Sequence, residues 1–363
     1  MKLVLNDFGA LKHTTTIEPR PLTIFCGANN TGKTYALYLL YALMDGRLGQ
    51  GLSGEQLKKA IPQFFAAEPD FASESVIDVQ WPAGLGRGHH RPFLLPAERS
   101  GINLFFRELN ARRATLMRAA SMTAFDTSDL LKEIVVSRYA QPIQDYIEFL
   151  NQQPEIKRST SEFADLATYL QKDVLKASYK IDRHGDISIK PKRSKAELGL
   201  HLGSSAVKTF FGLWSYLNHL ARPGDWLMID EPELNLHPSN QRIVARLLAQ
   251  LVNRGVQVVV STHSDYMVRE WGNLLMLGED FPARDALMAQ HGLEASQLLK
   301  ASDVAAYEFD HGKAEAMQVS HAEGISTKLF DQTIESLNSA AQDIYFARQA
   351  SQEEVFAPAQ EQA

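Results

Sequence analysis

Short apolar runs separated by polar turns dominate residues 1–101 and predict strands around one apolar helix. The predicted strands lie at 2–5, 22–25, 75–81 and 91–96. The helix is predicted at 35–44, where nearly every residue is apolar, and it ends near a glycine. We therefore expect a β-rich N-terminal part built around a single buried helix.

From about residue 102 the apolar positions follow a helical spacing. Helical periodicity is present at 102–109, 143–150 and 163–170, with polar connections between these stretches. Apolar and polar residues then alternate over 179–189, on both sides of a His-Gly pair, and this predicts a β-hairpin. We expect residues 102–200 to form a mainly helical insertion that closes with this hairpin.

Strand and helix patterns resume at 201 and continue to 345. Residues 305–309 and 330–345 are predicted to be a closing strand and helix, so that 201–345 complete the domain that 1–101 begin. The final residues, 346–363, are mostly polar and predict a disordered tail.

The composition is that of a globular protein, with 45% hydrophobic and 22% charged residues in a chain of 363. The net charge of −6 gives no global attraction to nucleic acid or anionic membranes, so such contacts would need a local patch. The single cysteine excludes an intrachain disulfide, and no apolar run is long enough to span a membrane. We expect a cytoplasmic protein without a membrane partner.

A phosphate-binding loop is the clearest chemical motif. Residues 27–34 read GANNTGKT, between a predicted strand and a predicted helix. Two glycines allow a tight turn whose N–H groups point at a phosphate, at the positive end of a helix. The residues assigned to nucleotide phosphates are Gly27, Asn29, Asn30, Thr31, Gly32, Lys33 and Thr34. Lys33 would bridge the β- and γ-phosphates, and the Thr34 hydroxyl would bind Mg²⁺.

A second motif lies far downstream, in WLMIDEPELNLHP at 226–238. An apolar strand ends there in Asp230 and Glu231, which point in opposite directions because they are adjacent on a strand. We assign Asp230 to the Mg²⁺ shell and Glu231 to the general base that polarises the attacking water. A solvated acidic turn is the alternative when this motif is considered alone.

A third motif is the β-branched run VVVSTHS at 258–264, a buried strand that ends in His263. A neutral imidazole at this place could contact the γ-phosphate and the attacking water. We therefore assign His263 to the catalytic residues, with Glu231 and Lys33.

The motif order GANNTGKT, LGSSAVK, MIDEPELNLHP and VVVSTHS resembles the ABC-type ATPases. Within them it is similar to the soluble branch that contains the OLD (overcoming lysogenization defect) ATPases and the SMC/RecF-like proteins. EPELNLHP and LLPAERSG are especially similar to the OLD-like branch. The resemblance implies an α/β fold with a mixed or parallel central sheet, an N-terminal antiparallel β subdomain and a helical insertion. ATP and Mg²⁺ are the cofactors it implies.

The resemblance also implies a two-subunit site. Residues 203–208 take the place of the signature loop, which in this family contacts the γ-phosphate bound by the opposite subunit. Ser204 and Ser205 are assigned to that contact, although the sequence departs from Leu-Ser-Gly-Gly-Gln. Without the resemblance, these small residues before a predicted helix are also compatible with a helix cap.

The resemblance also implies that residues 234–237 lie at the dimer interface. No Q-loop glutamine is obvious; Glu98 stands where its counterpart is expected, and we assign it to the metal site.

Full-length OLD nucleases also carry a TOPRIM domain, whose metal site needs a glutamate and a later Asp-x-Asp pair. The residues after His263 contain no such pair, and we expect the ATPase portion without the nuclease. The leading hypothesis is an ATPase that forms a homodimer, or a higher even oligomer, around ATP. It would regulate or assemble a separately encoded effector, with a nuclease among the candidates and phage defence as a setting that rests on the resemblance alone.

Two alternatives remain open. A RecF/SMC-like protein that binds DNA is supported by two groups of basic residues, Arg107, Arg112, Arg113 and Arg118, and Lys190, Lys192, Arg193 and Lys195. Charge clusters of this size also occur as solvated faces. The nucleotide-binding subunit of a membrane transporter is disfavoured by the helical insertion and the altered signature loop.

Overall fold

The computed structural model describes residues 1–48, 54–68, 70–81, 92–108 and 139–356. The chain forms two units, Met1–Ile325 and Ser326–Ala363. All of the motifs described above lie in the first unit.

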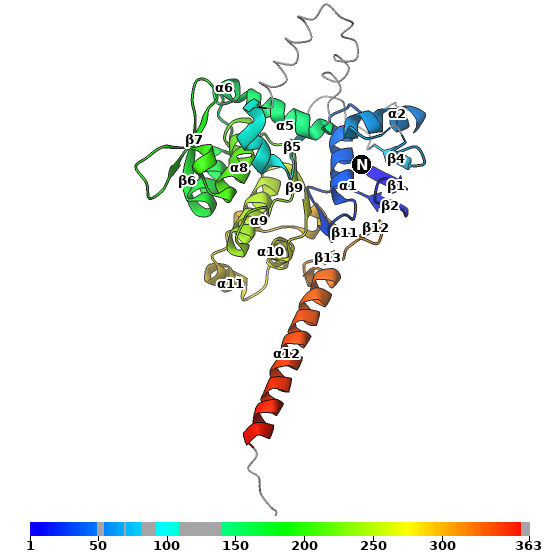
Figure 1. The fold of residues 1–363 in the computed structure, drawn as a ribbon, viewed down its shortest axis with the longest axis vertical. Helices are drawn as coiled ribbons and strands as arrows, with labels where there is room; N and C mark the ends of the chain where they lie inside the picture. The colour runs from blue at the N-terminus through cyan, green and yellow to red at the C-terminus, as the bar shows by residue number, and fades with distance from the viewer. Residues whose placement is uncertain (49–53, 69, 82–91, 109–138, 357–363) are drawn as a thin grey trace, which may run out of the picture. The chain divides into compact units, whose positions relative to one another are not determined.

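A six-stranded sheet forms the centre of this unit (Figure 1). Its strands, in spatial order, are β12 (Lys313–Ala316), β11 (Val304–Asp310), β3 (Leu22–Gly27), β10 (Gln257–Thr262), β9 (Trp226–Asp230) and β5 (Pro92–Leu95). Only β12 is antiparallel to its neighbour. Strands buried on both faces need continuous apolar runs, as Val258–Val260 illustrate. The α/β fold with a mostly parallel sheet is confirmed.

The sheet register brings the predicted motifs to one edge. Ser261 on β10 lies opposite Asp230 on β9 and opposite Phe25 on β3. The next residue of β10, Thr262, lies opposite Cys26. The carboxyl ends of the three strands therefore meet, which is where ligands bind in open parallel sheets.

The N-terminal antiparallel subdomain is also confirmed. It consists of β2 (Thr15–Ile17), β1 (Lys2–Asn6) and β4 (Val76–Gln80), in that spatial order. Helix α1 (Lys33–Met44) packs with side chains of this sheet and of the central sheet in one hydrophobic core, to which α2 (Gly54–Phe65) also contributes. Figure 1 shows α1 on one side of the central strands, with α9 (Pro238–Asn253) and α10 (Asp265–Met276) on the other.

The insertion contains helices and a small antiparallel sheet. Residues 99–108 are helical, and 109–138 lie outside the described residues. The remaining helices are α5 (Gln141–Asn151), α6 (Gln153–Ile156), α7 (Ala164–Tyr169) and the π-helical turn η1 (Leu170–Leu175). The predicted hairpin is confirmed as β6 (Ala177–Ile181) and β7 (Ile187–Pro191), and β8 (Leu198–Gly199) adds a third strand.

Helical segments follow the insertion and complete the first unit. They are η2 (Leu200–Leu202), α8 (Ser205–Ser215), η3 (Tyr216–Leu220), α11 (Arg284–His291), η4 (Ala295–Gln297) and η5 (Ala301–Asp303). A two-stranded sheet of β13 (Val319–Ser320) and β14 (Gly324–Ile325) ends it. None of the helices in the described ranges is long and apolar enough to cross a membrane.

The second unit contains one helix, α12 (Lys328–Phe356). The helix predicted at 330–345 lies within it. The expectation of a disordered tail from 346 is wrong as far as Phe356, because α12 continues through that stretch. Residues 357–363 lie outside the described part.

Candidate active site

The phosphate loop leaves β3 and enters α1 through two positions that require glycine. Gly27 has φ 135°, and a Cβ there would lie 2.1 Å from the carbonyl oxygen of Phe309 on β11. Gly32, the N-cap of α1, has φ 101° and offers no side chain to cap the helix. The backbone N–H groups at the start of α1 are therefore open to an anion.

Between these glycines the loop is exposed and internally bonded. Asn29 and Asn30 are exposed, and Asn30 has a left-handed φ of 61°. The Thr31 hydroxyl donates a hydrogen bond of 2.9 Å to the carbonyl oxygen of Ala28. Contacts within the loop therefore help to fix its shape.

Lys33 is buried, and its ammonium points back over the loop. Nζ donates to the carbonyl oxygens of Gly27, at 3.0 Å, and Ala28, at 2.6 Å. Burial lowers the pKa of Lys33, while the neighbouring Asp230 opposes this shift. An incoming phosphate would offer this desolvated cation a stronger, charged acceptor than the two carbonyls.

Asp230 receives hydrogen bonds from two other motifs. Its Oδ2 accepts from the Thr34 hydroxyl at 3.0 Å, and its Oδ1 accepts from the Ser261 hydroxyl. Burial raises the pKa of Asp230 to about 6, against the lowering effect of both hydrogen bonds. The structure therefore brings the predicted metal residues Thr34 and Asp230 together, and it adds Ser261, which sequence reasoning did not assign.

This pair fits Mg²⁺ because the ion takes one or two protein oxygens and fills its other positions with water and phosphate oxygens. Among the described residues no group of three or more His, Cys, Asp or Glu side chains could hold a metal alone. A site completed by substrate phosphate needs no such group. A bound divalent cation would also stabilise the charged form of Asp230, which burial disfavours.

Glu231 and His263 lie side by side at the ends of β9 and β10. Nδ1 of His263 is 3.8 Å from Oε1 of Glu231, and the side chains are 44% and 31% exposed. Glu231 has φ 52°, and its N–H donates to the carbonyl oxygen of Ser261 at 2.9 Å. Both side chains are therefore accessible from solvent while the backbone of Glu231 is held.

Glu233 is a third acid in this corner that sequence reasoning did not assign. Its side chain is only 6% exposed, and Oε1 accepts a 2.8 Å hydrogen bond from the His263 N–H. Nδ1 of His263 lies 3.7 Å from the same oxygen. The other oxygen, Oε2, is buried without a hydrogen-bond partner in the described part of the chain. Its place two residues after Glu231, in the quoted motif, was the available signal.

Glu98 is exposed, and its charge contributes to the raised pKa of Asp230. It is therefore near the site, but among the described residues the Asp230 carboxylate accepts its hydrogen bonds from Thr34 and Ser261. The next residue, Arg99, is buried and contacts the backbone of the Asp230 segment directly. In LLPAERSG the sequence therefore predicts Glu98 as the functional residue, whereas the structure shows the neighbouring Arg99 in contact with the Asp230 segment.

Ser204 and Ser205 lie at the exposed start of α8. The Ser204 hydroxyl accepts a hydrogen bond of 3.3 Å from the Val207 N–H, as a helix cap does. In Figure 1, α8 lies apart from α1, beyond the edge strand β5. Within one chain, the structure does not bring these serines to the phosphate loop.

The segment 234–237 contacts α8 instead. Asn235 has a left-handed φ of 62°, and its Nδ2 donates to the Thr209 hydroxyl on α8 at 2.8 Å. His237 caps α9 by accepting from the Ser239 N–H at 3.3 Å. The residues that follow Glu231 thus link the ends of β9, α8 and α9.

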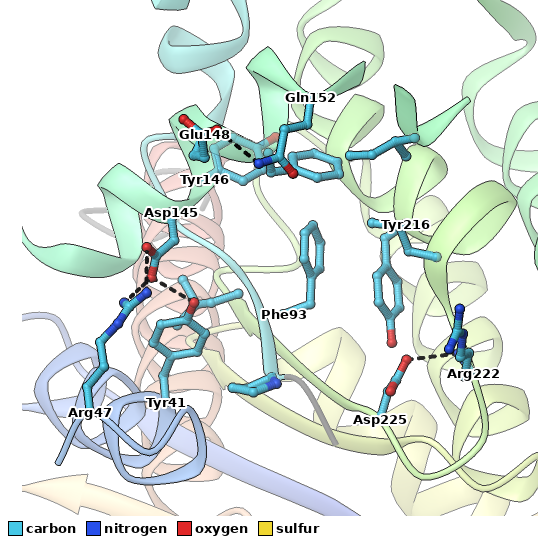
Figure 2. A pocket seen from close by; sticks show the side chains of 15 residues that line it. Tyr41, Arg47, Phe93, Asp145, Tyr146, Glu148, Gln152, Tyr216, Arg222 and Asp225 are labelled. Carbon is cyan, nitrogen blue, oxygen red and sulfur yellow. Dashed lines mark hydrogen bonds and ion pairs between the residues drawn. The ribbon is translucent and has the colours of Figure 1, made fainter. Parts of the chain in front are cut away.

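A separate cavity of about 760 Å³ lies beside β5 (Figure 2). Phe93 and Tyr216 stack with ring centroids 4.7 Å apart on one side, and Asp145 pairs with Arg47 and Tyr41 on the other. None of the residues assigned above to phosphate, metal or catalysis lines it. The candidate active site is therefore the corner formed by the phosphate loop and the ends of β9 and β10.

Comparison with known families identifies an AAA ATPase domain over residues 113–268. That range contains the second and third motifs but begins after the phosphate loop. Together with the corner described above, the match defines the class: the chain is an ATP-hydrolysing enzyme. No curated protein matches the sequence.

Among solved structures, three SMC head domains match this chain at low sequence identity. The Smc head of Pyrococcus furiosus, with an extended coiled coil and bound to the C-terminal domain of ScpA, is 14% identical; the match covers 94% of this chain and 98% of that one, with a TM-score of 0.39. A second Smc head, bound to the C-winged helix domain of ScpA, is 14% identical. That match covers 88% of this chain and 97% of the Smc head, with a TM-score of 0.42. The SMC head domain of Thermotoga maritima is 14% identical, and the match covers 88% of this chain and 98% of that one, with a TM-score of 0.34.

Proposed function

We propose that this ATPase belongs to the OLD-like branch, closes as a dimer around ATP and uses its cycle to regulate a separate effector protein. The observation that carries the proposal is the division of its site. The phosphate loop, Asp230 and Glu231 form one corner, while the exposed serines at the start of α8 lie elsewhere in the same chain. A second subunit would supply the serines that each corner lacks.

In this proposal the side chains have separate roles. The N–H groups of the loop and Lys33 bind the phosphates of ATP, and Thr34 and Asp230 hold Mg²⁺, which would neutralise charge that develops on them. Glu231 polarises the attacking water. His263, which lies 3.8 Å from Glu231, would contact the γ-phosphate and that water.

The effector is proposed from the resemblance to OLD-like proteins, in which ATPase and nuclease parts occur together. A separately encoded nuclease is one candidate class, and defence against phage is one setting. The helical insertion would carry the motion of the dimer to this partner.

Sedimentation of the Glu231→Gln variant tests the dimer. Removing the base while keeping its shape should slow turnover by about 10²- to 10⁴-fold and leave ATP binding intact. The variant should therefore sediment as a dimer with Mg²⁺-ATP and as a monomer without it. Glu155→Gln, on the exposed side of α6, is the matched control and should turn over as the wild type. A monomer with bound ATP in the slow variant would contradict the proposed dimer.

A DNA-binding ATPase is the second candidate. Four basic residues are exposed at the end of β7 and in the β7–β8 connection, and none forms a salt bridge among the described residues: Lys190, Lys192, Arg193 and Lys195. Arg107 instead pairs with Asp186 at 2.6 Å, and the other arginines of its group lie outside the described residues. Changing these four residues to glutamate should abolish salt-dependent binding to duplex DNA without changing ATP turnover. Unchanged DNA affinity would remove this candidate.

A further inference from the structure

Arg99 is a buried cation to which the roles proposed above assign no task. It is only 2% exposed. Nη1 donates to the carbonyl oxygens of Pro96, at 2.9 Å, and Asp230, at 2.6 Å, while Nη2 donates to the carbonyl oxygen of Glu231 at 2.6 Å. One guanidinium therefore joins the segment after β5 to two consecutive peptides at the end of β9.

Burying a guanidinium is costly unless its donors and its charge are both compensated. Burial lowers the pKa of Arg99, and the neighbouring groups oppose that shift: Tyr146 first, then Asp230, Glu233 and Glu231. The donors of the guanidinium are thus compensated by three backbone carbonyls, and its charge is compensated by neighbouring acidic groups. Its planar fork can hold two neighbouring carbonyls at once, which a lysine ammonium does less well.

The peptide that Arg99 holds is the one that needs support. Glu231 has φ 52°, a left-handed conformation that is strained for a non-glycine residue. This turn of the backbone directs the carboxylate toward His263, 3.8 Å away. If the carbonyls of Asp230 and Glu231 lost their shared donor, the Glu231 peptide could relax and misplace the carboxylate.

We propose that Arg99 is the positioning residue for Glu231, acting through the backbone and not through substrate. The inference rests on the proposed role of Glu231 as general base. It assigns the functional importance of LLPAERSG to the arginine and not to the exposed Glu98.

The same helix extends this connection to α8. Asn103 lies one turn after Arg99, and its Nδ2 donates to the carbonyl oxygen of Lys208, in the first turn of α8, at 2.7 Å. Its Oδ1 accepts from the buried Tyr146 hydroxyl at 2.8 Å; Tyr146 is labelled in Figure 2. Residues 99–108 therefore connect the backbone of the general base to the helix that begins at the serines.

The first test separates turnover from binding. Arg99→Lys keeps the charge but loses the fork, so kcat should fall by about 10²-fold while the Kd for ATP changes by less than about 2-fold. Arg20→Lys is the matched control, because Arg20 also donates from Nη1 to backbone carbonyls, those of Ala301 and Val304, away from the site. Equal losses of kcat and ATP affinity in Arg99→Lys would overturn the proposal.

The second test asks whether Arg99 acts through Glu231. In the Glu231→Gln background, Arg99→Lys should cause no further loss of kcat, because the group that it positions is already absent. A multiplicative loss in the double variant would instead make Arg99 an independent contributor.

The third test uses the nucleotide-free protein and needs no activity. The Glu231 N–H is bonded to the Ser261 carbonyl oxygen, so hydrogen exchange over 228–236 reports on this peptide. Exchange there should be at least about 10-fold faster in Arg99→Lys, with exchange in α9 unchanged. Unchanged exchange would overturn the proposal even if turnover falls.

If Arg99→Lys does not fold, Arg99→Gln, which can still donate to one carbonyl, takes its place in all three tests. Normal turnover of Glu231→Gln would refute the proposed base but leave the exchange result on Arg99 interpretable.

Discussion

The Thr34 hydroxyl donates a hydrogen bond of 3.0 Å to Oδ2 of Asp230, across 196 positions in the sequence. This contact joins the start of α1 to the end of β9. Both atoms are hard oxygen donors of the kind Mg²⁺ prefers. In the proposed site, Mg²⁺ would replace this hydrogen bond and bind both oxygens.

Lys33→Ala should abolish ATP hydrolysis and weaken ATP binding by at least about 10-fold, because the γ-phosphate loses its fixed cation in a partly desolvated site. Nucleotide affinity and phosphate release would measure this. Lys12→Ala removes a lysine that is exposed and pairs with Asp7, and it should behave as the wild type. Wild-type turnover by purified Lys33→Ala would refute the assignment of the phosphate loop.

Stability should depend on pH through Asp230, whose pKa burial raises from its ordinary 3.8 to about 6. The folded state then binds more protons than the unfolded state between these values, so the free energy of unfolding falls as pH rises through this window. The loss amounts to about 3 kcal/mol once pH exceeds 6. Denaturant unfolding of nucleotide-free protein should show this loss, and Asp230→Asn should be more stable than wild type at pH 7 and similar near pH 4.

Mg²⁺ should reverse part of this effect, since the ion binds the deprotonated carboxylate. With nucleotide present, the gain in the free energy of unfolding that Mg²⁺ causes should become larger as pH rises through about 6. Asp230→Asn should lack this pH dependence. A Mg²⁺ effect that is constant with pH in the wild type would place the ion elsewhere.

Ser204→Arg should separate nucleotide binding from hydrolysis. The exposed start of α8 would gain bulk and charge, which would block contact with a second subunit while each phosphate loop still binds ATP. ATP affinity, sedimentation and turnover would be compared with those of Ser302→Arg, an exposed serine in η5. The lost cap costs about 1 kcal/mol, so thermal unfolding should be recorded beside these measurements. Normal turnover by monomeric Ser204→Arg would mean that the active site is complete in one chain.

Gly27→Ala should destabilise the first unit by at least about 2 kcal/mol, because the new Cβ meets the Phe309 carbonyl and φ is 135°. Urea unfolding would measure the loss. Gly101→Ala is the control: nothing lies within 4 Å of its Cβ position, and alanine in a helix should stabilise by about 0.5 to 1 kcal/mol. Equal stability of the two variants would show that the approach of β3 to Phe309 can relax.

Local signals were sufficient for much of the fold. The strands around 22–25 and 258–260, the apolar helix after Gly32, and the hairpin around Gly185 follow from side-chain periodicity and backbone preference, which act over a few residues. The tail prediction was wrong because composition does not decide whether a polar stretch continues an existing helix. Residues 346–356 extend α12, in which elongation is easier than nucleation.

The sequence by itself determined the chemical groups of the site: a phosphate loop, an acid pair after an apolar strand, and a histidine after another. Each is a short motif whose spacing reflects local backbone geometry. Only the tertiary structure decided which residues support them. Arg99 and Glu233 are buried against peptides that lie 30 or more positions away, at Glu231 and His263. Burial and hydrogen-bond partners depend on the packing of the whole sheet, and no local pattern encodes them.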